Sequence, residues 1–122
     1  MATTNDFSRS FGVNAALSAF RRVRVSSNGS IDYALSTEMG VGVVQQDVTN
    51  QSYYTPQVRF YGTGTVMVSV TAVPVTIGDT IFAASNGQVS STGTVTAGKT
   101  LTSAATNGDW IELVPCQTAG GV

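Results

Sequence analysis

The chain has 122 residues, of which 42% are hydrophobic and 11% charged, and its net charge is −1. This length fits one domain with a modest core, and the hydrophobic content excludes an intrinsically disordered chain. The absence of a basic excess argues against general nucleic-acid binding, which needs clustered lysine and arginine. A typical soluble domain has about 25% charged residues, so we expect this surface to be covered by small polar side chains or by another chain.

The residue types predict an all-β fold. Valine and threonine each occur 17 times, whereas leucine occurs four times, glutamate twice and lysine once. β-branched side chains fit a pleated sheet, while Leu, Glu and Lys are favoured in helices. We therefore expect a small β-barrel or sandwich of short antiparallel strands, with an extended N-terminal arm.

The arm is predicted over residues 1–19, which show no alternation of apolar and polar residues. Its aromatic residues, Phe7 and Phe11, need an apolar surface to pack on. Because residues 1–20 contain Asp6 and no unbroken apolar core, we do not expect a signal peptide. No apolar run approaches the roughly 20 residues that span a membrane.

A β domain is predicted over residues 20–116, followed by a loose tail over residues 117–122. Alternation of apolar and polar residues, typical of strands, recurs at short intervals and is separated by turn residues. The predicted strands are residues 20–25, 31–35, 39–48, 57–61, 65–72, 80–83, 88–90 and 110–114.

Two kinds of turn recur along the chain. Asn28-Gly29 and Asn86-Gly87 tolerate the positive φ of hairpin turns. Gly-Asp pairs, with Asp79 and Asp109, each precede a strand. An aspartate in such a turn commonly accepts a hydrogen bond from its own backbone, so we predict a structural role for both.

Catalytic chemistry is poorly supported by the sequence, since it has no histidine and one cysteine, Cys116. Ser–His and Cys–His nucleophile pairs are therefore excluded, a zinc site lacks its usual ligands, and no internal disulfide can form. Lys99 lies in TAGKT, which lacks the spacing of a phosphate-binding loop, and is expected in a turn. We expect no enzyme activity, no metal and no cofactor.

Positive charge gathers near the N-terminus. Residues 1–30 carry four arginines and one aspartate, a local charge of +3, whereas residues 62–122 have a local charge of −2. These arginines form either a solvated strand face or a basic patch that meets an acidic partner surface.

The order of motifs resembles the small capsid decoration proteins of tailed phages. The matching segments, within Ala19–Cys116, are FRRVRVSSNGSIDYAL, GVGVVQQDV, a central VRF strand and VTIGDTIFAASNGQVSSTGTVTAGKTLTSAATNGDWIELVPC. Lys99 and Thr100 depart from the glycine or small apolar residues usual at these positions in that family.

This resemblance implies a structural virion protein that binds the outer surface of an assembled capsid and stabilises it. The protein would be made in the host cytoplasm, and its partners would be the major capsid protein and copies of itself, often as a trimer. Three weak contacts made together bind strongly through effective concentration. Neither nucleic acid nor membrane is an expected partner.

We hypothesise that residues 1–24 contact the capsid, with aromatic anchors and arginines as charge partners. A chain lacking residues 1–19 is then expected to stay folded and to lose capsid attachment. The candidate residues are Phe7, Arg9, Phe11, Phe20, Arg21, Arg22 and Arg24.

Three other classes of protein stay open. A tail or fibre module would also be all-β. A carbohydrate-binding module would use Trp110 with Tyr33, Tyr53, Tyr54 and Tyr61, although packing in the core or at an interface is the favoured interpretation of Trp110. A hydrolase or calcium-binding protein would use carboxylates from Asp47, Asp79, Asp109 and Glu112.

Overall fold

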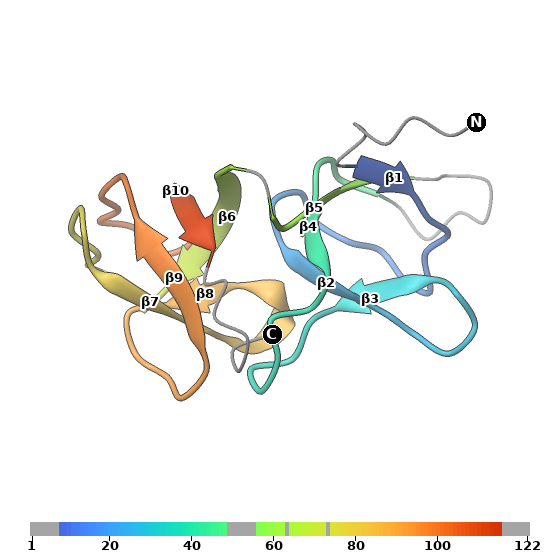
Figure 1. Cartoon of the computed structure of the whole chain (residues 1–122), viewed down its shortest axis with the longest axis horizontal. Coiled ribbons are helices and arrows are strands. Elements are labelled where there is room, and N and C mark those ends of the chain that lie inside the picture. Colours follow the sequence, from blue (N-terminus) through green and yellow to red (C-terminus); the bar gives the residue numbers. More distant parts are fainter. Residues whose placement is uncertain (1–7, 49–55, 63, 73, 116–122) are drawn as a thin grey trace.

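The computed structural model describes residues 8–48, 56–62, 64–72 and 74–115 and consists of two five-stranded β units side by side (Figure 1). This part of the chain contains no α-helix and one turn of 3-10 helix, Ser85–Gly87. None of its helical segments is long and apolar enough to cross a membrane. The predicted all-β class, built from short strands, is confirmed.

The N-terminal unit contains β1 (Ser8–Ser10), β2 (Arg22–Val25), β3 (Ile31–Tyr33), β4 (Gly42–Val44) and β5 (Gln57–Phe60). They lie in the order β1-β5-β4-β2-β3, and all neighbours are antiparallel. A parallel bridge between Val13 and Ile31 joins the segment after β1 to β3 and so connects the two edges of the sheet. The core consists of Phe11, Leu17, Val23, Ile31, Val44 and Val58.

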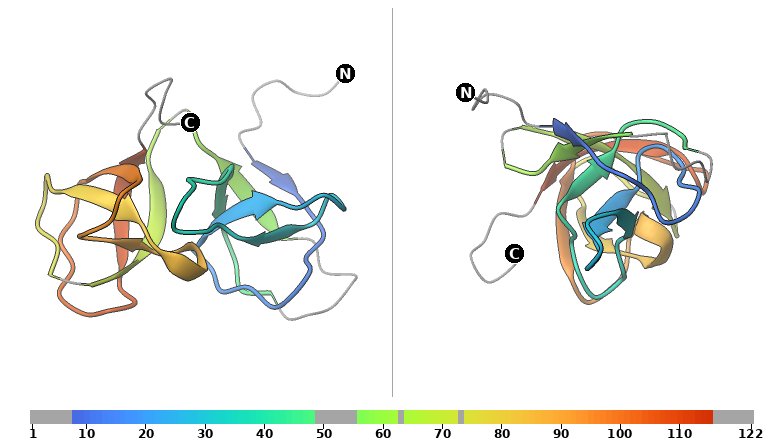
Figure 2. Two further views of the ribbon diagram at one scale, coloured as in Figure 1. Left: turned by 90° about the horizontal axis from the view of Figure 1, so that it is seen from below. Right: turned by 90° about the vertical axis from the view of Figure 1, so that its right-hand side faces the viewer.

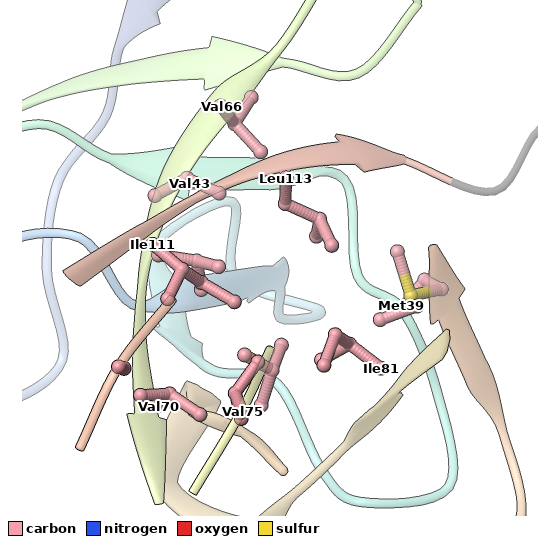
Figure 3. Packing of buried hydrophobic residues seen from close by; sticks show 12 residues of the cluster. Met39, Val43, Val66, Val70, Val75, Ile81, Ile111 and Leu113 are labelled. Atoms are coloured by element: carbon pink, nitrogen blue, oxygen red, sulfur yellow. The ribbon is translucent and has the colours of Figure 1, made fainter. Parts of the chain in front are cut away.

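The C-terminal unit contains β6 (Val66–Thr71), β7 (Thr80–Ala83), β8 (Val89–Ser90), β9 (Thr96–Thr100) and β10 (Trp110–Pro115). They form a closed barrel in the order β10-β6-β8-β7-β9, in which only the pair β6–β8 is parallel. Met39 and Val43 of the N-terminal unit pack on the core of this barrel, beside side chains such as Ile81 and Ile111 (Figure 3).

The predicted hairpins and Gly-Asp turns are present, but the turn expected at Lys99 is wrong. Lys99 lies within β9 with its side chain exposed. Lys99 lies between the buried Gly98 and Thr100, and the small buried residues Ala97 and Gly98 hid the alternation of a strand.

The two units, which lie side by side in the left view of Figure 2, repeat one topology. If β1–β5 are matched in order with β6–β10, each antiparallel pair of one unit recurs in the other. The parallel contact recurs too, as Val13 beside Ile31 and as Val70 beside Val89. The hairpin turns Ser27-Asn28-Gly29 and Ser85-Asn86-Gly87 then occupy the same place.

The register of the strands also matches, as one pair of glycines shows. A Cβ atom on Gly42 would lie 2.2 Å from the carbonyl oxygen of Arg59, and one on Gly98 would lie 2.0 Å from that of Val114. Such close approach of two backbones admits only glycine. Each unit therefore has the same steric requirement at the same position of its fourth strand.

Contacts outside the strands repeat as well. Reciprocal backbone hydrogen bonds join Leu17 to Val48 in the first unit and Val75 to Ala104 in the second. Together with the matched pairings and glycines, these bonds establish the chain as a tandem repeat of one β unit.

Residues 8–19 belong to the N-terminal unit rather than to an arm beside it. β1 pairs with β5, and the side chains of Phe11 and Leu17 are only 9% and 5% exposed. The structure thus differs from the predicted boundary at residue 19, and the division between units lies between β5 and β6. After β1 this segment pairs only through isolated bridges at Val13 and Leu17, so it lacks the alternation of apolar and polar residues that predicts a strand. Residues 1–7 and 117–122 lie outside the described residues.

Candidate interaction surface

Arg22 is fully buried at the junction of the two units, which corrects its prediction as a capsid contact. Its guanidinium donates hydrogen bonds to four backbone carbonyls, two in each unit. Burial lowers the pKa of Arg22 because the charged form loses water, an effect opposed by the nearby Tyr61 and Glu38. The four acceptors are the carbonyl oxygens of Leu35, Glu38, Ala84 and Gln88.

The other described arginine side chains near the N-terminus also have partners. Arg21 donates to the carbonyl oxygen of Asn86 at 3.0 Å, and its guanidinium lies 5.4 Å from the ring centre of Tyr33. Arg24 forms an ion pair with Glu38 at 3.2 Å. Arg21, Arg22 and Arg24 are therefore not gathered into an unpaired basic patch.

The aromatic residues predicted as anchors lie in different surroundings. Phe11 packs in the core of the N-terminal unit, edge-on to Phe60 at 6.1 Å between ring centres, so it is not available to a capsid. Phe20 is half-buried and reaches the surface. Phe7 lies outside the described residues, and Arg9 is described only through its backbone in β1.

Phe20 adopts a backbone conformation that is uncommon for a residue with a side chain. Its φ is +60°, and the matching position of the C-terminal unit is Gly78, with φ +89°. The left-handed conformation costs roughly 1–2 kcal/mol for residues other than glycine. Two backbone hydrogen bonds hold this conformation in place. The N–H of Phe20 donates to the carbonyl of Val44, and the N–H of Ser69 donates to the carbonyl of Phe20.

This conformation places the Phe20 ring against Trp110, with 4.4 Å between ring centres. Trp110 begins β10 and is 55% exposed, so its other side faces solvent. Met67 on β6 is a diagonal neighbour, because Trp110 pairs with Ser69 and Glu112 with Met67. An open depression is lined by Met67, Gly108, Asp109 and Trp110.

We call Phe20, Met67, Asp109 and Trp110 the Trp110 surface. Tryptophan, phenylalanine and methionine are enriched at protein–protein interfaces, where buried aromatic residues provide much of the binding energy. The surface therefore suits a protein partner that covers the indole ring. Alternation along β10 indicates that Trp110 points away from the buried Ile111, whereas no local pattern indicates its contact with Phe20.

Three of the candidate carboxylates accept hydrogen bonds from other groups of the fold. Asp79 accepts the N–H of Thr76 at 2.9 Å, and Asp109 accepts that of Thr106 at 3.2 Å, which confirms their predicted turn role. Glu112 accepts the hydroxyl of Thr65 at 2.6 Å. Within the described ranges, no three Cys, His, Asp or Glu side chains come together as a metal site would require.

Tyr33 and Tyr61, the two tyrosines that the structure describes, have other partners than Trp110. Tyr33 accepts the N–H of Ser18 through its hydroxyl and stacks with Arg21. Tyr61 donates to the carbonyl of Met39 at 2.9 Å, and burial raises the pKa of Tyr61 well above its usual value, with a smaller opposing effect from Arg22. Tyr53 and Tyr54 lie outside the described residues.

No protein-family model and no curated protein matches the chain. A solved structure does match: the head fibre gp8.5 N base of bacteriophage phi29, with a TM-score of 0.73 and 19% sequence identity. The chain shares its fold with this head fibre base. Because the match covers 89% of this chain and 92% of the other, both units are shared and not one alone.

Proposed function

We propose that this chain is a structural protein of a phage virion that binds the outer surface of an assembled capsid and stabilises it. The observation that carries this proposal is the likeness of nearly the whole chain to a head fibre base. A protein with this role needs a rigid body and an adhesive surface. The two packed units and the Trp110 surface meet these two requirements.

The major capsid protein is the proposed partner of the Trp110 surface. Of the two predicted aromatic anchors that the structure describes, Phe11 is buried and Phe20 lies at an exposed apolar surface. Phe7, Arg9, Arg21 and Arg24 stay predicted contacts, while Arg22 and Phe11 are removed from the set by their burial.

A second candidate function is the base of a head fibre, which the same structural likeness favours. Such a base would also bind the head, but it would carry a projecting fibre. Electron microscopy of the particle distinguishes the two functions, because a fibre appears as density that extends beyond the two β units.

Capsid attachment is expected to weaken at least about 30-fold when Trp110 is replaced by alanine, since truncating an interface hot spot costs about 2 kcal/mol or more. The measurement is co-sedimentation of the purified chain with heads of the phage that encodes it. Binding of the wild-type chain should saturate.

Leu35→Ala is the matched control, because Leu35 is an aliphatic residue, 51% exposed, that is not part of the Trp110 surface. This variant should bind like the wild type. Equal binding by Trp110→Ala and Leu35→Ala, with both variants folded, would remove the Trp110 surface from the proposal. Failure of the wild-type chain to bind heads would remove the proposed function.

A further inference from the structure

The contact between the two units joins different surfaces of the same fold. The C-terminal unit contributes its hairpin turn, residues 84–88, in which Gly87 donates to the carbonyl of Ala34 at 3.1 Å. The N-terminal unit contributes the face that carries Arg21 and Arg22, whose guanidinium groups bond carbonyls of that turn. A contact of unlike surfaces is heterologous, so each chain retains one unused copy of each surface.

The unused turn is residues 26–30 of the N-terminal unit. The serine and asparagine are exposed in both turns, but Gly29 is exposed whereas Gly87 of the docked turn is buried. Val25 beside the turn is 40% exposed, while its counterpart Ala83 is 3% exposed.

This turn is preformed for docking. The side-chain oxygen of Asn28 accepts hydrogen bonds from the Ser26 hydroxyl at 2.6 Å and from the Ser30 N–H at 3.0 Å. A turn already held in shape loses little conformational entropy when it binds.

The unused face lies on the C-terminal unit. The counterparts of Arg21 and Arg22 are Asp79 and Thr80, and both are exposed. Backbone bonds from Gly78 to Thr100 and from Thr100 to Asp79 bring the neighbouring Ile77 and Leu101 to this face.

Ile77 and Leu101 are 65% and 46% exposed. We call Ile77, Asp79, Thr80 and Leu101 the Ile77 face. This face presents exposed aliphatic side chains. It also contains Thr80, whose counterpart Arg22 is covered by the 84–88 hairpin turn of the same chain.

We propose that copies of this chain associate head to tail, with the 26–30 turn of one copy docked on the Ile77 face of the next. The partner is a second copy, because that turn and that face are the counterparts of two surfaces already in contact within the chain. On the capsid this association rests on the proposed function, since the lattice would align the copies; in solution it stands independently.

The contact between copies is expected to be weaker than the contact within the chain. Thr80 stands where Arg22 stands in the N-terminal unit, so the bonds of the buried guanidinium are not repeated. The covalent link within the chain also provides an effective concentration of millimolar order for a short connection, which separate copies lack. Trapping by cross-linking therefore suits this contact.

The test uses full-length chains with Cys116→Ser and one new cysteine each, either Ser27→Cys or Thr80→Cys. Both new positions are exposed. The two chains are mixed and treated with a short bismaleimide. Head-to-tail contact predicts covalent heterodimers enriched roughly tenfold over either homodimer, because unlike surfaces meet.

Leu101→Asp added to the Thr80→Cys chain should lower the heterodimer yield roughly tenfold. Leu35→Asp in the same chain is the control, because the exposed Leu35 belongs to neither the 26–30 turn, the Ile77 face nor the Trp110 surface, and it should leave the yield unchanged. Homodimers as abundant as heterodimers, or no cross-linked dimer, would overturn the proposal. Saturable binding to heads without heterodimers would contradict the association and leave the proposed function in place. Heterodimers without head binding would support the association and contradict the proposed function.

Discussion

A chain that lacks residues 1–19 is expected to lose the folded N-terminal unit. Deletion removes Phe11 and Leu17 from the core and exposes β5 by removing β1. Loss of a buried Phe costs about 3–5 kcal/mol and loss of a buried Leu about 2–5 kcal/mol. Their sum is comparable to the whole stability of a typical domain, about 5–15 kcal/mol. Thermal unfolding followed by circular dichroism should show a strongly reduced or absent cooperative transition.

Deletion of residues 1–7 is the matched control, because it leaves β1 and the core residues in place. This shorter deletion should preserve the unfolding midpoint. If the chain lacking residues 1–19 also unfolds at the wild-type midpoint, the assignment of residues 8–19 to the N-terminal unit is wrong and the separable arm predicted from the sequence is correct.

Arg22→Met is expected to lower the free energy of unfolding by about 3–5 kcal/mol, the cost typical of removing one member of a buried charged network. Methionine fills similar volume but donates no hydrogen bonds. Carbonyl groups from both units would then lie buried without the donor that Arg22 provides. Urea unfolding at equilibrium measures this loss.

Two variants make the result specific. Arg24→Met removes another arginine of the same strand. Its ion pair with Glu38 is partly exposed, so we expect a loss of at most about 1 kcal/mol. Arg22→Lys keeps the charge but replaces the planar fork of donors, so its loss should be intermediate. A loss in Arg22→Met no larger than that in Arg24→Met would contradict the role of Arg22 in joining the units.

The fold class followed from composition and periodicity, since Val66, Val68 and Val70 alternate inward as their spacing predicts. Asp79 and Asp109 bond the turns before their strands, as residue type and position indicate. These features depend on neighbours in the sequence, which explains why the sequence was sufficient for them.

Arg22 shows why part of the candidate site was not predictable. Alternation correctly separates Arg22 from Val23, but it does not reveal that the outer face of β2 is covered by the C-terminal unit. The contact of Phe20 with Trp110 is likewise long-range. Burial and pairing of this kind depend on the tertiary arrangement, which a local pattern does not contain.

The tandem repeat left one clear trace in the sequence. VRVSSNGSI and IFAASNGQV share Ser-Asn-Gly and place apolar residues at matching positions. Elsewhere the matched positions differ in chemistry, as with Phe20 and Gly78 or Arg22 and Thr80. The repeat is therefore visible mainly in backbone pairing and in the two glycines of closest approach.

Electron cryo-microscopy of the intact phage particle is the decisive experiment for a capsid-bound role. We expect density for both β units on the outer surface of the head, with the Trp110 surface toward the capsid. Heads whose exterior carries no such density, or density for the chain in the tail instead, would contradict that role.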